Sequence, residues 1–181
     1  TCLSENIEIN IATIREITKQ IDIPLIVCGG VRRLEDIKKL LYAGASKICM
    51  KRAPLEDINI VRDAAERFGS ERIIVTIDLS ECDNPVEYAT LLKKYGAGEL
   101  LLIHNNKVDN YDNIVKTIRN EVGLPVIAST YATNAFDIAN TLKTTEAEVI
   151  SLYNLEKHDI MDIKHVCKNE GIAVNLFESS M

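Results

Sequence analysis

Six short apolar segments recur along the chain, and longer stretches with helical periodicity lie between them. The apolar residues of each segment are consecutive rather than alternating, which is typical of strands buried on both faces of a parallel sheet. The longer stretches place apolar side chains three and four residues apart, which predicts amphipathic helices. The predicted strands are Ile23–Cys28, Lys47–Met50, Arg72–Asp78, Glu99–His104, Leu124–Ser129 and Glu148–Leu152. The predicted helices are Leu34–Ala43, Leu55–Phe68, Val86–Tyr95, Tyr111–Val122 and Asp159–Asn169.

The chain contains an internal repeat with a spacing of 101 residues, the step from Asp36 to Asp137. The segment Ile23–Gly30 resembles Leu124–Tyr131 at the same spacing. Two such halves, each of alternating strands and helices, predict an eight-stranded parallel (βα)8 TIM barrel. The counterpart of Asp78 would lie before the first residue. We therefore expect residues 1–181 to form a single barrel domain that is incomplete at its N-terminus and lacks the first one or two strands.

Two alternatives concern the shape and assembly of six strand–helix units. Six strands cannot close with the geometry of an eight-stranded barrel, so an open doubly wound sheet is the competing fold. An open barrel would also leave its first and last strands without neighbours, and unpaired edges invite pairing between chains. A homodimer formed through these edges is therefore expected for the isolated chain.

Composition and charge exclude several classes of function. The net charge is −6 and no basic stripe is present, which argues against nucleic-acid binding. No apolar run approaches the roughly 20 residues that span a membrane. The five cysteines form no CxxC pair, so neither a disulfide framework, a zinc site nor any other cofactor is indicated. Cys28 and Cys49 lie in apolar runs and are expected to be buried, in a reducing cytoplasm.

Four segments carry a resemblance to a known family: Pro24–Asp36, Ala43–Ile48, Phe68–Asp78 and Gly96–Leu102. They resemble the HisA/HisF family of histidine biosynthesis, whose members are TIM barrels of the ribulose-phosphate-binding type. The subgroup they resemble most is HisF, the cyclase subunit of imidazole glycerol phosphate synthase. The chain is also similar to the N-terminal barrel of bifunctional proteins in which phosphoribosyl-AMP cyclohydrolase and phosphoribosyl-ATP diphosphatase modules follow.

The resemblance implies a catalytic carboxylate at Asp78. In the family, two carboxylates face each other across the barrel mouth and act as general acid and base. Asp78 matches the fifth-strand carboxylate, whereas the first-strand carboxylate has no counterpart in this sequence. Barrel enzymes place reacting groups at the C-terminal ends of their strands, which favours a catalytic role. The alternative is an aspartate that only caps the following helix.

The resemblance also implies sites for the two phosphates of a phosphorylated ribose-type substrate. Gly29 and Gly30 would hold one phosphate through backbone N–H groups. Lys51 and Arg52 replace small polar ligands of the family, and they either hold this phosphate or are solvated surface charges. Ser129 matches a ligand of the second phosphate, but Thr130 and Tyr131 stand where the family has two glycines, so we expect this second site to be eroded.

Three further charged or polar residues are candidates. His104 ends a predicted strand near the barrel mouth, where it either transfers protons or is a hydrogen-bonded structural histidine. Lys47 and Glu99 match a charged gate at the bottom of the family's barrel, which faces an ammonia-supplying glutaminase. They would otherwise form a plain salt bridge between neighbouring strands.

Two functions remain open. The departures at the phosphate sites favour a catalytically depleted barrel that serves as an accessory or phosphate-binding domain. The alternative is an active cyclase (a lyase) or the sister isomerase of the family, using Asp78 together with a carboxylate from the missing first strand. The expected partners are a phosphorylated ribose-type molecule and either a glutaminase subunit or a fused phosphoribosyl-AMP cyclohydrolase module.

Overall fold

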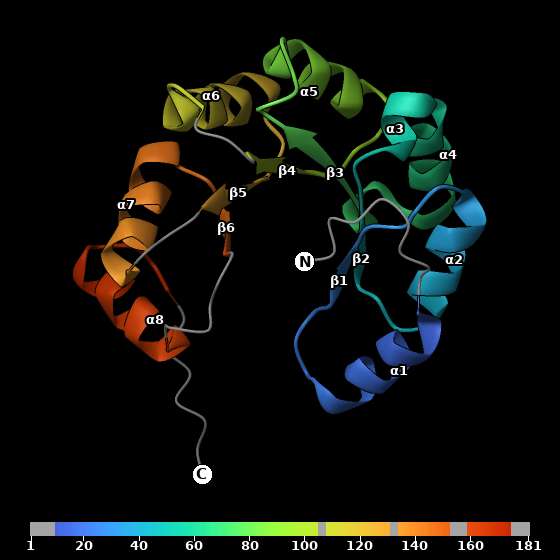
Figure 1. The fold of residues 1–181 in the computed structure, drawn as a ribbon, viewed down its shortest axis with the longest axis horizontal. Coiled ribbons are helices and arrows are strands. Elements are labelled where there is room, and N and C mark those ends of the chain that lie inside the picture. Colours follow the sequence, from blue (N-terminus) through green and yellow to red (C-terminus); the bar gives the residue numbers. More distant parts are fainter. Residues whose placement is uncertain (1–9, 105–107, 131–133, 153–158, 175–181) are drawn as a thin grey trace.

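The computed structural model describes residues 10–104, 108–130, 134–152 and 159–174. Six parallel strands pair in sequential order into one curved sheet, and the helices lie along its outer side (Figure 1). This arrangement is an open half-barrel. The strands are β1 (Ile26–Cys28), β2 (Lys47–Met50), β3 (Ile73–Asp78), β4 (Glu99–Ile103), β5 (Val126–Thr130) and β6 (Val149–Leu152). The sequential order has no reversal point, so the doubly wound alternative is wrong.

Within the described ranges, eight α-helices and two further helical turns precede, connect or follow the strands. The α-helices are α1 (Ile11–Gln20), α2 (Leu34–Tyr42), α3 (Ala53–Glu56), α4 (Asn59–Phe68), α5 (Pro85–Lys94), α6 (Tyr111–Thr117), α7 (Ala135–Thr145) and α8 (Ile160–Asn169). The turns are η1 (Ser70–Arg72) and η2 (Ile118–Val122), the latter with π-helical geometry.

Successive strand residues point to opposite faces of the sheet, and each face has its own apolar cluster. On the outer face, strand residues such as Ile48, Val75 and Leu102 pack with helix residues into the main core. On the inner face, Cys49 and Ile74 pack with Ile127 in a smaller cluster. The inner face is the wall that would enclose the interior of a closed barrel.

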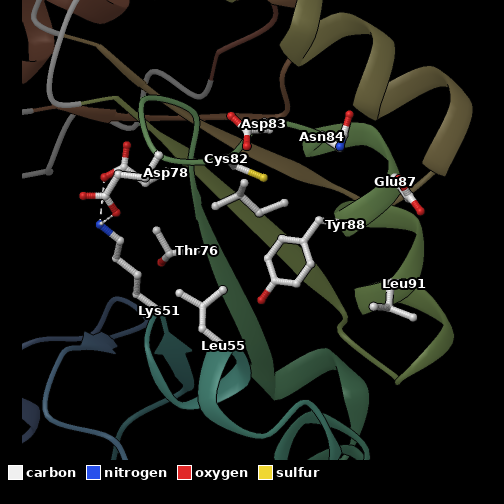
Figure 2. A pocket seen from close by; sticks show the side chains of 12 residues that line it. Lys51, Leu55, Thr76, Asp78, Cys82, Asp83, Asn84, Glu87, Tyr88 and Leu91 are labelled. Carbon is white, nitrogen blue, oxygen red and sulfur yellow. Dashed lines mark hydrogen bonds and ion pairs between the residues drawn. The ribbon is translucent and has the colours of Figure 1, made fainter.

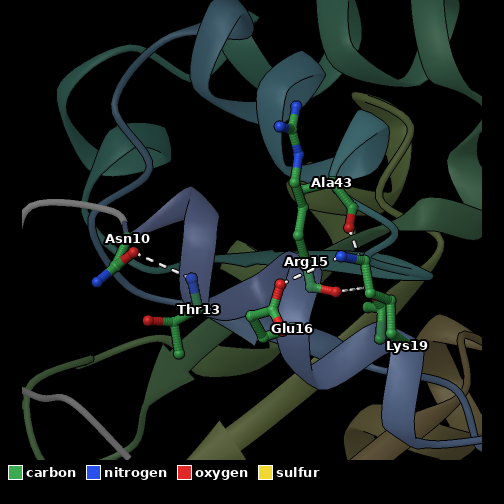
Figure 3. A network of polar contacts seen from close by, with 7 residues as sticks. Asn10, Thr13, Arg15, Glu16, Lys19 and Ala43 are labelled. Carbon is green, nitrogen blue, oxygen red and sulfur yellow. Dashed lines mark hydrogen bonds and ion pairs between the residues drawn. The ribbon is translucent and has the colours of Figure 1, made fainter.

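The helix α1 was not predicted, and Figure 3 shows how it is held. The side chain of Asn10 accepts a hydrogen bond from the Thr13 N–H at 3.0 Å and so caps the helix N-terminus. Near the other end, the Thr18 hydroxyl donates to the carbonyl of Ala43 at 3.1 Å, which ties α1 to the C-terminal end of α2. Only Ile14 of α1 is buried, and such a narrow apolar stripe is hard to recognise in a sequence.

Two predicted helices are interrupted, and one further helix was missed. The predicted helix Leu55–Phe68 consists of α3 and α4, which are separated because the Asp57 carboxylate accepts the Asn59 N–H at 3.0 Å and starts a new helix. The predicted helix Tyr111–Val122 ends in the π-helical turn η2. The helix α7 lies 101 residues after α2, at the repeat spacing, although it was not predicted as a helix.

Gly98 allows the close packing of β4 against the turn before β3. A Cβ atom at this position would lie 2.0 Å from the carbonyl oxygen of Ser70. Its N–H donates to the carbonyl of Ile73 at 3.0 Å. Glycine is therefore required here by contact with another part of the backbone rather than by its own torsion angles.

Candidate functional site

Asp78 is the last residue of β3, and its side chain is only 2% exposed. One carboxylate oxygen accepts the Nζ of Lys51, which follows β2, at 2.7 Å. The other oxygen accepts the N–H of Ser80 at 3.1 Å. β2 and β3 are parallel neighbours, so the residues that follow their C-terminal ends meet at the same edge of the sheet. The lysine and the carboxylate point toward one another in Figure 2.

Lys51 forms a second ion pair, with the exposed carboxylate of Glu81 at 3.1 Å. Partial burial alone would lower the pKa of the Lys51 ammonium, but its hydrogen bonds and ion pairs with Asp78 and Glu81 outweigh this effect and raise that pKa above its ordinary value. The ammonium is therefore charged at neutral pH and bound between two carboxylates.

A pocket of about 380 Å³ opens beside this ion pair, between β3, α3 and α5 (Figure 2). Lys51 and Asp78 line one side, and the phenol ring of Tyr88 lies among apolar side chains on the other. Burial and the nearby Cys82 raise the pKa of the Tyr88 hydroxyl. This hydroxyl is buried and, among the described residues, has no hydrogen-bond partner.

Gly29 and Gly30 follow β1 with φ angles of 93° and 70°, in the region that favours glycine. Arg52 follows Lys51 in the next loop, immediately before α3. Because β1 pairs with β2, these two loops lie side by side at the C-terminal edge of the sheet. The structure thus brings the glycines and Arg52 to one edge, while Lys51 turns toward Asp78.

Ser129 lies in β5, its side chain is fully buried, and its hydroxyl has no hydrogen-bond partner among the described residues. Its carbonyl accepts the Tyr111 hydroxyl at 2.8 Å, and the ring of Tyr111 lies 4.5 Å from the ring of His104. His104 therefore packs against an aromatic ring at the end of β4. Tyr131, the residue expected to disturb this second phosphate site, lies outside the described residues.

Lys47 and Glu99 form an ion pair on the inner face, at the N-terminal ends of β2 and β4. The expected salt bridge is therefore present, but it crosses β3 instead of joining neighbouring strands, since β3 lies between β2 and β4. The pair spans the bottom of the half-barrel, opposite the edge that carries Asp78. Its role as a gate stays a prediction.

Sequence reasoning missed Glu81, Tyr88 and Tyr111. Glu81 lies three residues after Asp78, and a second acid so close to a strand-end aspartate was the available signal. Nothing in the sequence pairs Tyr111 with the carbonyl of Ser129. In the described ranges, no group of three or more histidine, cysteine or acidic side chains is arranged to hold a metal ion. No helix in the same ranges is long and apolar enough to cross a membrane.

Comparisons with known proteins assign the fold to a family. The family described as histidine biosynthesis protein matches residues 1–154. The chain is 32% identical to the imidazole glycerol phosphate synthase subunit HisF of Exiguobacterium sp. (strain AT1b), a match that covers 100% of the chain and 79% of the relative. It is 30% identical to the HisF subunit of Dehalococcoides mccartyi (strain BAV1), over 90% of the chain and 74% of the relative.

A parallel open half-barrel with helices along its outer side is consistent with part of a TIM barrel. The chain belongs to the HisA/HisF family of histidine biosynthesis proteins, and the relatives named above are HisF subunits.

Proposed function

We propose that this chain is a HisF-like barrel of histidine biosynthesis that has lost catalytic activity and serves as an accessory, phosphate-binding domain. In this proposal the six strands are part of an eight-stranded barrel whose first one or two strands lie outside the sequence. The ligand is a phosphorylated ribose-type molecule. The partner is a glutaminase subunit or a fused phosphoribosyl-AMP cyclohydrolase module.

The observation that carries the proposal is the ion pair between Lys51 and Asp78. A general acid–base residue must come within hydrogen-bond reach of the substrate atom whose proton it exchanges. One oxygen of the Asp78 carboxylate already accepts the Lys51 ammonium at 2.7 Å, and the other accepts the Ser80 N–H at 3.1 Å. Lys51 lines the pocket beside Asp78, so a ligand that reached the carboxylate from the pocket would compete with this ion pair.

The phosphate-binding part of the proposal rests on the edge where the loops after β1 and β2 meet. Gly29 and Gly30 leave room for a phosphate beside the backbone, and Arg52 can bind a phosphate with two parallel N–H donors. Lys51 adds positive charge nearby, although its ammonium is held by Asp78 and Glu81. Ser129 is the remaining element of a second site, but its side chain is fully buried, so an anion would reach its hydroxyl only after the end of β5 rearranged.

One observation favours the alternative of an active cyclase or isomerase. Asp78 lies at the C-terminal end of a barrel strand and borders a pocket large enough for part of a small ligand. In that case Lys51 would move away when the substrate binds, and a carboxylate from the first strand would complete the pair. His104 would be a further candidate for proton transfer.

Isothermal titration calorimetry with inorganic phosphate and ribose 5-phosphate tests the phosphate site. We expect measurable binding that weakens about tenfold or more in Arg52→Ala, because a hydrogen bond to a charged group contributes roughly 1.5–3 kcal/mol. Lys51→Ala should weaken binding less. Arg62→Ala is the matched control, since Arg62 is an exposed arginine of α4 paired with Asp63. Equal affinities of Arg52→Ala and Arg62→Ala would contradict the proposed site.

A further inference from the structure

Two cysteines face each other on the inner wall of the half-barrel. Cys28 of β1 and Cys49 of β2 are direct partners in the parallel register of the two strands. Adjacent strands lie about 4.8 Å apart, which falls within the Cα separation of about 4.4–6.8 Å found in disulfides. Both side chains belong to the inner face, because Cys49 packs in its cluster with Ile74.

The two thiols differ in their surroundings. Cys28 is exposed, which corrects the expectation that it is buried, whereas Cys49 is buried as expected. The sulfur of Cys49 lies 2.9 Å from the hydroxyl oxygen of Thr76 on β3. Cys28 is therefore accessible to a small oxidant, while Cys49 is held by the neighbouring strand in reach of Cys28.

The pKa values of the two thiols are also shifted in opposite directions. A hydrogen bond from Cys49 lowers the pKa of the Cys28 thiol, although the protein atoms around Cys28 partly desolvate the thiol and work against this effect. The same hydrogen bond and its own burial raise the pKa of Cys49 well above its ordinary value. The thiolate, rather than the thiol, is the nucleophile in cysteine chemistry. Oxidation-sensitive cysteines combine a lowered pKa, solvent access and an adjacent resolving cysteine.

We propose that Cys28 and Cys49 form a hydroperoxide-reactive dithiol, in which Cys28 is oxidised first and Cys49 closes a disulfide between β1 and β2. This site lies outside the chemistry of the histidine-biosynthesis family site. Cys28 is the last residue of β1, and the proposal requires that this end of β1 stays open to solvent in the eight-stranded barrel of the proposed function. Cys28 directly precedes Gly29, so the disulfide would also tie the glycine loop to β2.

The reaction balances with hydrogen peroxide as the only oxidant. The Cys28 thiolate attacks one peroxide oxygen, an S–O bond forms, the O–O bond breaks, and hydroxide leaves and takes up a proton. The sulfur of Cys49 then attacks the sulfenic sulfur of Cys28, an S–S bond forms and the S–O bond breaks. The proton of Cys49 and the departing hydroxide form water. Two thiols lose two electrons in total, and one peroxide becomes two waters.

The test treats the full chain with equimolar hydrogen peroxide and maps its thiols by mass spectrometry without reduction. Cys2 lies outside the described residues and is replaced by serine in every form, which leaves Cys28, Cys49, Cys82 and Cys167. Trypsin separates Cys28 from Cys49, so their disulfide appears as a linked peptide pair. We expect this pair, the loss of two thiols and full recovery with dithiothreitol.

Single variants separate the two roles. Cys49→Ser should keep Cys28 reactive, so that dimedone labels its sulfenic acid and no linked pair forms. Cys28→Ser should show no rapid loss of thiols. Cys82→Ser is the matched control and should still form the pair, since burial raises the pKa of Cys82. Iodoacetamide should alkylate Cys28 faster than Cys82, because the pKa of the Cys28 thiol is lowered and that of the Cys82 thiol is raised.

Two results would overturn the proposal. One is thiol loss in Cys28→Ser at the rate of the unsubstituted chain. The other is retention of all four thiols under conditions that oxidise free glutathione. Circular dichroism of each variant verifies that it is folded before its thiols are compared.

Discussion

The pairing of Lys51 with Asp78 makes a quantitative prediction for stability. In Lys51→Met the carboxylate of Asp78, whose side chain is 2% exposed, would lose the charge that compensates it. Removing one partner of a fully buried ion pair costs about 3–5 kcal/mol. Lys51 itself retains 28% exposure, and the Ser80 N–H still binds Asp78, so we expect a loss somewhat below this range, about 2–3 kcal/mol.

Urea unfolding monitored by circular dichroism measures this loss. With a urea dependence of about 2 kcal/mol per molar, the unfolding midpoint should fall by about 1 M or slightly more. The double variant Lys51→Met/Asp78→Asn should recover part of the loss, because it no longer buries an unpaired charge. Lys143→Met is the control, since Lys143 forms a more exposed pair with Glu170 and should change stability by less than about 1 kcal/mol.

Two outcomes would refute this reasoning. Lys51→Met could be as stable as Lys143→Met, which would mean that the ion pair with Asp78 contributes nothing. Alternatively, the double variant could be no more stable than Lys51→Met. That result would mean that the loss of stability comes from the missing lysine stem rather than from the buried Asp78 charge that lacks its compensating ammonium.

Three further predictions concern pH, packing and assembly. The folded-state pKa of Lys51 is raised, so the contribution of its charge to stability is present at neutral pH and disappears as pH rises through that pKa. In urea titrations the stability difference between the chain and Lys51→Met should therefore shrink at alkaline pH, and a difference that stays constant there would contradict this. Gly98→Ala should lower the unfolding free energy by about 3 kcal/mol, since the added Cβ would lie 2.0 Å from the Ser70 carbonyl oxygen. Gly171→Ala is the control: its added Cβ would have no atom within 4 Å, so it should cost only about 1–2 kcal/mol for its positive φ. The isolated chain should form dimers or larger assemblies in light scattering through the edges of β1 and β6, and a monodisperse monomer would argue against edge pairing.

The strands were predictable because burial on both faces leaves a signal in consecutive residues. Each observed strand lies inside its predicted segment, except that β5 extends one residue further, to Thr130. The internal repeat correctly related β1 to β5. The helices were harder to predict. The side-chain cap at Asp57 separates α3 from α4 without changing the spacing of apolar residues. α1 buries a single residue, Ile14, so its apolar periodicity is weak.

The site was only partly predictable. The position of Asp78 at a strand end followed from the strand pattern, but its ion pair did not. Lys51 and Asp78 are 27 residues apart, and their contact depends on the register of β2 with β3 and on the direction of a flexible side chain. The exposure of Cys28 could not be predicted either, because an apolar strand does not reveal that its inner face is open.

The most direct test of the proposed loss of catalysis is steady-state turnover. A complete barrel containing this sequence would be assayed with ammonia and the phosphoribosyl substrate of imidazole glycerol phosphate synthase, with the HisF subunit of Exiguobacterium as the positive control. We predict no turnover above that of the Asp78→Asn variant. Turnover by the unsubstituted barrel that Asp78→Asn abolishes would contradict the proposal and establish Asp78 as a catalytic residue.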